Sequence, residues 1–296
     1  MKTKIKIFLK HLYININRPE MEVLPGQLAF YFIMMLIPLL TLLGALLTYV
    51  DLGVTSINEA IFDNLPHNIA SVIMTISEQE VNQNSFWILL IPALILASNG
   101  TYSMIITSNS IYKVKNNRNI IIGYILDRIK AFIMLVILIL IFVFLLLVPT
   151  FGNILFKVIG MIVTNESIID NLYYVLFNFL KYPISFLIIF FAVKILYILA
   201  PNTKVKRKEA NYGALFTSIM WIICTWGYSY YIEYFSTYET FYGGMSSILF
   251  LMLWIYLLSY IFALGLSLNA SYYEIEKLDI NTEKNNDIDK ENDQKV

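Results

Sequence analysis

The residues that could support acid–base or metal chemistry are few in this chain of 296 residues. Its two histidines are His11 and His67, and its single cysteine, Cys224, excludes an intramolecular disulfide and a cysteine-based zinc site. The chain has no glycine-rich phosphate loop, no HExxH and no CxxC motif. A hydrolytic site needs carboxylates or imidazoles that converge in one pocket. We therefore expect a protein that is not an enzyme and that uses no cofactor or metal ion.

One charged residue within an apolar stretch is a stronger candidate for function. Lys194 lies seven residues before Pro201, which places it roughly 10 Å inside the end of a predicted helix at 1.5 Å per residue. Its ammonium group could extend along the helix to the membrane interface, as buried lysines often do. Alternatively, it could face a water-filled cavity and contact an anionic group such as a lipid phosphate. The sequence leaves both interpretations open.

A stripe of polar side chains in another apolar segment is the second candidate. It consists of Ser98, Asn99, Thr101, Ser103 and Thr107. Such side chains often hold membrane helices together through hydrogen bonds, but they could also line a polar pathway. The Asn99–Gly100 pair suggests a helix break that would expose backbone groups to such a pathway. Asn99, Thr101 and Thr107 are therefore candidate pathway or anion-contact residues, together with Lys194.

The elements that must position these residues are predicted to be membrane helices. Of all residues 58% are hydrophobic and 14% are charged, whereas a soluble chain usually carries about 25% charged residues. Six windows reach the length and apolarity of a membrane-spanning helix. They cover residues 28–50, 86–108, 131–148, 182–200, 214–234 and 247–270. The sequence therefore predicts an all-α membrane protein with six transmembrane helices.

The distribution of Lys and Arg predicts the orientation of these helices. From the N-terminal segment to the tail, the segments between the windows carry 5, 0, 5, 2, 4, 0 and 4 basic residues. Because cytoplasmic loops are enriched in Lys and Arg, this alternation predicts a multi-pass protein of the inner or plasma membrane with both termini in the cytoplasm. His11 and His67 then lie on opposite sides of the membrane. The formal net charge of zero indicates no nucleic-acid partner.

Three segments lie outside the predicted spans. Residues 1–22 form a basic amphipathic segment at the cytoplasmic face, and residues 23–272 form the transmembrane domain. The loop of residues 51–85 has apolar residues at helical spacing, which predicts an amphipathic outer segment between the first two membrane helices. Residues 273–296 are rich in acidic residues, Asn and Lys with few apolar residues, so we expect a disordered tail.

Several short motifs, in a fixed order between Leu28 and Ala270, resemble the YihY/BrkB family of bacterial inner-membrane proteins, once described as ribonuclease BN-like. The resemblance begins at Leu28-Ala29-Phe30-Tyr31 in the first helix. The matching motif residues are Pro38, Pro201, Asn202, Gly213, Tyr242, Gly243, Trp254, Tyr256, Gly265 and Asn269. Two positions depart from the family pattern, because Met35 replaces a serine and Ser267 replaces an acidic residue.

The resemblance implies a six-helix membrane protein of the cell envelope and no settled activity. We expect transport or lipid handling, with membrane lipids as partners and an unknown substrate. The alternative is a non-transporting scaffold for envelope assembly, with the 51–85 loop as its contact surface. A ribonuclease is the weakest interpretation, since the chain offers so few residues for its site. A homo-oligomer and an envelope-protein partner are both compatible with the sequence.

Overall fold

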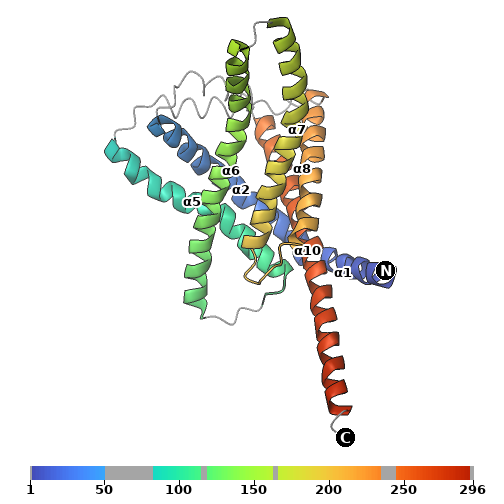
Figure 1. The fold of residues 1–296 in the computed structure, drawn as a ribbon. Coiled ribbons are helices and arrows are strands. Elements are labelled where there is room, and N and C mark those ends of the chain that lie inside the picture. The colour runs from blue at the N-terminus through green and yellow to red at the C-terminus, as the bar shows by residue number, and fades with distance from the viewer. Residues whose placement is uncertain (1, 51–82, 115–118, 163–165, 235–244, 294–296) are drawn as a thin grey trace. The chain divides into compact units, whose positions relative to one another are not determined.

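The computed structural model describes residues 2–50, 83–114, 119–162, 166–234 and 245–293 (Figure 1). Every regular element within these residues is an α-helix. The helices are α1 (Lys2–Ile16), α2 (Glu20–Val50), α5 (Gln83–Ile111), α6 (Ile120–Ile162), α7 (Glu166–Leu199), α8 (Glu209–Tyr234) and α10 (Met245–Asp293). The prediction of an all-α protein is therefore confirmed.

Each of the six predicted membrane windows lies within a different one of these helices, from α2 to α10, apart from one terminal residue of the fourth window. Among the described residues, Ile248–Lys277 in α10 is long and apolar enough to cross a membrane. Pro183–Leu199 in α7 is a shorter apolar helix. The presence of six crossings stays a prediction. Most of the 51–85 loop lies outside the described residues, because the description resumes at residue 83. The motif residues Tyr242 and Gly243 also lie outside them.

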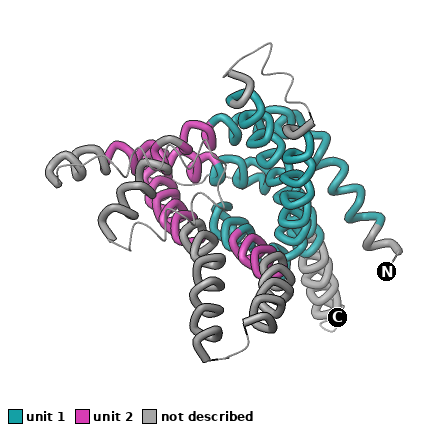
Figure 2. Tube along the Cα trace, turned by 90° about the horizontal axis from the view of Figure 1, so that it is seen from above, with its two compact units in different colours: residues 1–30, 104–117, 193–296 teal, residues 31–103, 118–192 magenta. Residues whose placement is uncertain are grey.

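Figure 2 shows that the chain forms two compact units. Unit 1 comprises residues 1–30, 104–117 and 193–296, and unit 2 comprises residues 31–103 and 118–192. Helix α5 contributes its first part to unit 2 and its last turns, from Met104, to unit 1.

Unit 1 is organised around α10, which packs against α8 and α1. Two glycines allow α8 and α10 to approach closely. A Cβ atom on Gly213 would collide with the backbone oxygen of Gly265 and with the Asn269 side chain. A Cβ atom on Gly265 would collide with Tyr197 and Thr217. Small residues have this role in membrane helix pairs, because they let two backbones come close together.

Unit 2 has an apolar core formed by α2, α5 and α6. Its buried residues are Met35, Ala97, Leu135 and Ile139, with Phe32, Leu39, Ala93 and Leu94 packed against them. Helix α5 is continuous through Asn99 and Gly100, so the helix break suggested by that pair is wrong. Gly100 instead makes room for the Met35 side chain, which a Cβ atom at this position would overlap. The glycine thus serves close packing, and an α-helix accommodates it at a modest cost in propensity.

The polarity of the helix faces is the reverse of that in a soluble bundle. On α8 the side chains of Leu215, Ile219, Ile223 and Trp226 are exposed, at spacings of three or four residues. On α10 the pairs Ile248–Leu249, Met252–Leu253 and Tyr256–Leu257 repeat at the same interval. Buried positions meanwhile include the hydroxyls of Thr217, Ser218, Ser259, Ser267 and Ser271. Exposed apolar stripes of this extent indicate a surface that contacts lipid.

The C-terminal end differs from the disordered tail expected for residues 273–296. Helix α10 continues to Asp293, and Glu274 and Glu276 bind residues of other segments. Extending an existing helix avoids the cost of nucleation, and Glu and Lys are good helix formers. The basic segment of residues 1–22 contains α1, which packs on α10 through the tilted rings of Phe8 and Tyr272, 4.5 Å apart.

Candidate functional site

The polar stripe of α5 is used partly for helix packing. The Thr101 hydroxyl is fully buried and lies 2.7 Å from the backbone oxygen of Ala131 on α6 and 3.0 Å from that of Ser98. The Ser98 hydroxyl donates to the backbone oxygen of Ile95, one turn earlier. Thr101 thus links α5 to α6 within unit 2, as polar side chains often do between membrane helices.

Asn99, on the same stripe, contacts an arginine of α6. Its Oδ1 accepts a hydrogen bond of 2.7 Å from Nη1 of Arg128. Nε of Arg128 donates to the Tyr124 hydroxyl at 3.0 Å, and the guanidinium carbon lies 4.2 Å from the centre of the Tyr102 ring. The guanidinium is therefore oriented by three neutral side chains, with a cation–π contact to Tyr102.

Thr107, on the last turns of α5, belongs to a set of buried polar groups in unit 1. Its hydroxyl has no hydrogen-bond partner among the described residues. The same holds for polar atoms from the end of α5, from α8, from α10 and from α1. These atoms are Ser108 Oγ, Tyr112 Oη, Asn211 Oδ1, Asn269 Nδ2 and Asn15 Oδ1. Because buried polar atoms are nearly always hydrogen-bonded, directly or through ordered water, each of these atoms is a place where water or a polar group can bind.

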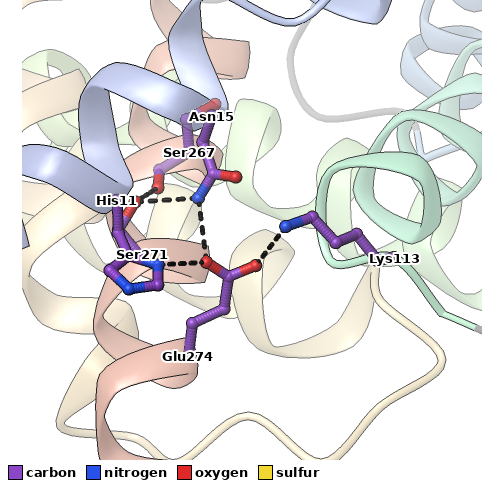
Figure 3. A network of polar contacts seen from close by, with 6 residues as sticks. All are labelled: His11, Asn15, Lys113, Ser267, Ser271 and Glu274. Carbon is purple, nitrogen blue, oxygen red and sulfur yellow. Dashed lines mark hydrogen bonds and ion pairs between the residues drawn. The ribbon is translucent and has the colours of Figure 1, made fainter.

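A second polar network of unit 1 joins three segments around Glu274 (Figure 3). Its Oε1 accepts a hydrogen bond of 2.6 Å from Nζ of Lys113, and its Oε2 lies 3.0 Å from Nδ1 of His11. Nδ2 of Asn15 donates to the Ser271 hydroxyl at 3.0 Å and contacts Glu274 Oε2 at 3.4 Å. The network thus fixes α1 and the end of α5 to α10.

Lys113 reaches Glu274 from a strained backbone position. Its φ of 53° lies in the left-handed region, which glycine prefers. The amide of Val114 donates to the carbonyl of Asn109, and that of Lys113 to the carbonyl of Ser110. These two bonds form a Schellman cap, in which the left-handed residue ends α5. A lysine at this position indicates that its ion pair with Glu274 offsets the backbone cost.

Two carboxyl groups meet near the start of α8. Glu209 is buried, and its Oε2 accepts the backbone N–H of Lys206, as in half of a capping box. Burial raises the pKa of Glu209 to about 7, and the neighbouring Glu276 adds to this rise. Glu276 is more exposed and forms an ion pair with Nζ of Lys206. Glu276 therefore stays ionised, and the proton of the pair resides on Glu209.

Several family-motif residues lie together in unit 1, at the close approach of α8 and α10. The Tyr197 hydroxyl contacts Thr217 Oγ1 at 2.6 Å and donates to the carbonyl of Phe262 at 2.9 Å. Asn269 Oδ1 accepts the backbone N–H of Gly213 at 2.7 Å. These contacts bind α7, α8 and α10 to one another, which gives the motif residues a role in packing.

The remaining motif residues occupy caps and ring contacts. Backbone N of Asn202, next to the buried Pro201, donates to Asn109 Oδ1 at 2.7 Å. The Trp254 ring stacks on Tyr228 at 5.7 Å, and Tyr256 contacts Tyr260 at 6.3 Å. Pro38 lies in the continuous helix α2 and is half-buried.

Lys194 is half-buried on α7, in unit 1, next to the buried Val193. Asn99 and Thr101 belong to unit 2, whereas Thr107 and Lys194 belong to unit 1. The candidates named from the sequence therefore divide between the two units.

Four charged residues of these sites were not singled out from the sequence as binding groups. Arg128 and Lys113 belong to the basic residues that predict the orientation of the helices, and Glu274 lies in the tail that the sequence predicts to be disordered. A signal for Arg128 was available, because a charged residue directly before an apolar run and one turn after Tyr124 is typical of a membrane interface.

Comparison with known proteins decides the family. The family model described as Virulence factor BrkB matches residues 12–289. The chain belongs to this family. The ribonuclease-like protein YfkH of Bacillus subtilis (strain 168) is 28% identical over 274 residues, which cover 92% of this chain and 97% of that protein.

Other relatives of this BrkB-family chain carry a membrane name. The UPF0761 membrane protein VP0125 of Vibrio parahaemolyticus is 26% identical over 91% of this chain and 83% of its own length. The UPF0761 membrane protein PSHAa0171 of Pseudoalteromonas translucida is 41% identical over 75 residues, a quarter of each chain. No solved structure matches the chain. The expected resemblance to the BrkB family is thus confirmed, and the chain is a membrane protein.

The types of these side chains limit the chemistry that each can support. Within the described residues, no three His, Cys, Asp or Glu side chains lie together as metal ligands would. Glu274 is engaged by Lys113, His11 and Asn15. The polar groups that lack partners are hydroxyls and amides, which can bind water or a polar solute but are weak bases.

Proposed function

We propose that this BrkB-family protein transports a solute or handles lipids in the cell envelope, without performing chemistry itself. The observation that carries the proposal is the set of buried hydroxyl and amide groups without partners in unit 1, contributed by four helices. Leaving such groups unpaired in an apolar surrounding costs several kcal/mol each, roughly 2–7 kcal/mol. A hydrated interior inside helices with apolar outer faces avoids this cost. It would also accommodate the polar part of a transported solute or lipid.

The proposal includes the orientation derived from the basic residues. Six crossings with both termini in the cytoplasm would place Lys204, Lys206, Arg207 and Lys208 at the cytoplasmic face. There they would contact anionic headgroups, since each basic residue near such a surface contributes about 1 kcal/mol of attraction. Membrane lipids are thus the proposed partners, and the substrate is unassigned.

The accessibility of Thr107 to water tests the proposal. We would replace Cys224 with serine and introduce Thr107→Cys or Ile105→Cys, since both residues are fully buried on the same helix. The full-length protein in liposomes is then treated with a small, water-soluble thiol reagent. We expect the Thr107→Cys protein to react at least about tenfold faster than the Ile105→Cys protein.

Equal protection of both cysteines would show a dry interior and contradict the proposal. A parallel measurement follows translocation of a fluorescent phospholipid between leaflets, where Thr107→Val is expected to slow any activity that the protein shows. The alternative, an assembly scaffold, predicts instead that replacement of residues 51–85 abolishes the cellular function while Thr107→Val preserves it.

A further inference from the structure

We propose that the guanidinium of Arg128 binds the phosphate group of an anionic membrane lipid. This inference rests on the proposed function and names a substrate class for it. It concerns unit 2 alone, where Arg128 on α6, Asn99 and Tyr102 on α5, and Tyr124 on α6 come together.

The first argument is the state of the guanidinium. It carries a full positive charge and five N–H donors. Two donors bind the Asn99 amide oxygen and the Tyr124 hydroxyl, which leaves three without a hydrogen bond to any described residue. No ion pair joins it to a carboxylate of the described residues, although Asp127 lies close enough to the same Tyr102 ring to interact with it electrostatically. The charge is thus held by neutral groups, with donors left for an anion.

The second argument is the degree of order. The Tyr102 ring lies 4.2 Å below the guanidinium carbon and the Tyr124 ring 5.3 Å from it. These contacts and the two hydrogen bonds hold the planar group in one orientation. A preoriented guanidinium matches two phosphate oxygens at once, so little conformational entropy is lost on binding.

The third argument is the surrounding surface. The side chains of Ile121, Ile122, Ile125 and Ile129 are each more than half exposed on the same stretch of α6. Arg128 lies three residues before the apolar window that begins at Ala131. This position corresponds to the depth of the lipid headgroups. Apolar side chains that contact acyl chains, next to a cation at headgroup depth, match a molecule with both an anionic and an apolar part.

The test uses the full-length protein in an uncharged detergent and three soluble probes. Short-chain phosphatidylglycerol carries the phosphate and the acyl chains, the matching diacylglycerol lacks the phosphate, and glycerol phosphate lacks the chains. We expect phosphatidylglycerol to bind and to raise the unfolding temperature, and the other two to bind at least about tenfold more weakly. Arg128→Gln should weaken binding of phosphatidylglycerol by about tenfold or more, because charge-assisted hydrogen bonds are lost.

Two further variants make the result decisive. Arg18→Gln makes the same change at a half-buried arginine of unit 1 that takes part in neither polar network, and it should leave the affinity unchanged. Tyr124→Phe changes a half-exposed side chain, so the protein should fold, and it should weaken binding by releasing Nε of Arg128. Unchanged affinity in Arg128→Gln, or in Tyr124→Phe if Arg128→Gln does not fold, would overturn the proposal. Equal binding of diacylglycerol would overturn it too, and equal binding of glycerol phosphate would assign the site to a soluble phosphate instead of a lipid.

Labelling at Thr107 separates this inference from the proposed function. If phosphatidylglycerol does not bind at Arg128 but the Thr107→Cys protein reacts with the thiol reagent, the interior is hydrated and serves another substrate. Lipid binding at Arg128 with a protected cysteine would leave a lipid-binding protein without a polar interior.

Discussion

At the scale of single residues, the buried carboxyl of Glu209 makes stability depend on pH. Its pKa is raised to about 7 by burial and by the ionised Glu276, whereas an unfolded glutamate titrates near 4.5. The folded state therefore binds the proton more tightly than the unfolded state. The stabilisation is complete below pH 4.5 and is lost as the pH rises through about 7.

This linkage gives a measurable prediction. The unfolding temperature of the wild-type protein should contain a component that falls between pH 5 and pH 7.5, and Glu209→Gln should remove that component. Since glutamine cannot ionise but can still accept the N–H bond of Lys206, the variant should match the wild type at the acidic end. Parallel pH profiles of the two proteins would refute the assignment.

Lys113 tests whether an ion pair offsets backbone strain. Lys113→Gly removes the bond to Glu274 but relieves the left-handed conformation, so we expect a change in unfolding free energy within about 1 kcal/mol. Lys113→Met loses the charge and keeps the strain, so it should be less stable than Lys113→Gly. Chemical denaturation of both variants measures the difference, and a more stable methionine variant would show that the backbone strain is negligible.

The sequence predicted residue types better than residue roles. It indicated that Asn99, Thr101 and Thr107 are special, because polar residues in an apolar helix are costly. It could not assign their partners, since Arg128 and Ala131 follow about 30 residues later on another helix. Glu274 was missed for a similar reason, because one acid among many in a polar tail gives no indication of the basic groups that fold against it.

At the scale of elements, the close approach of α8 and α10 depends on two glycines. Gly265→Ala should destabilise the protein by roughly 1–3 kcal/mol, because its methyl group meets Tyr197 and Thr217 in a packed core. Gly227 on α8 has no atom within reach of an added methyl group, so Gly227→Ala should be neutral or slightly stabilising. Thermal unfolding in detergent compares the two substitutions, and equal effects would contradict the packing role.

Helix positions followed well from the sequence, and helix ends did not. Apolar length identified five of the six long helices, because a membrane-length apolar run has few alternatives, and the alternation of basic residues supported the more polar window of residues 86–108. Helix α10 extends beyond its predicted window, since polar residues outside an apolar window can continue a helix. Helix α6 extends beyond its window at both ends, through segments that are themselves mostly apolar. The packing role of Gly100 was also missed, because a glycine signal alone does not separate a break from a close contact.

At the scale of the whole molecule, the proposed topology can be measured directly. Reporter fusions after residues 117 and 208 and at the C-terminus should show cytoplasmic activity, and a fusion after residue 60 should show activity outside the cytoplasm. The reason is the alternation of basic residues between the predicted spans. A cytoplasmic signal at residue 60 would remove the first two crossings from the proposal.

The attachment of α10 to three other segments has a consequence for cooperativity. Glu274 binds α1 and the end of α5, and Glu276 binds the loop before α8. A chain that stops after Tyr273 would lose these three carboxylate contacts at once but keep the Asn15–Ser271 bond and the Phe8–Tyr272 ring contact, whereas a chain that stops after Lys277 would retain all of them. The cost of shortening the chain should therefore rise abruptly over four residues, and local opening of α1 should become easier at that step. Hydrogen exchange in α1 would report that step, because this helix is fastened at a residue more than 250 positions away.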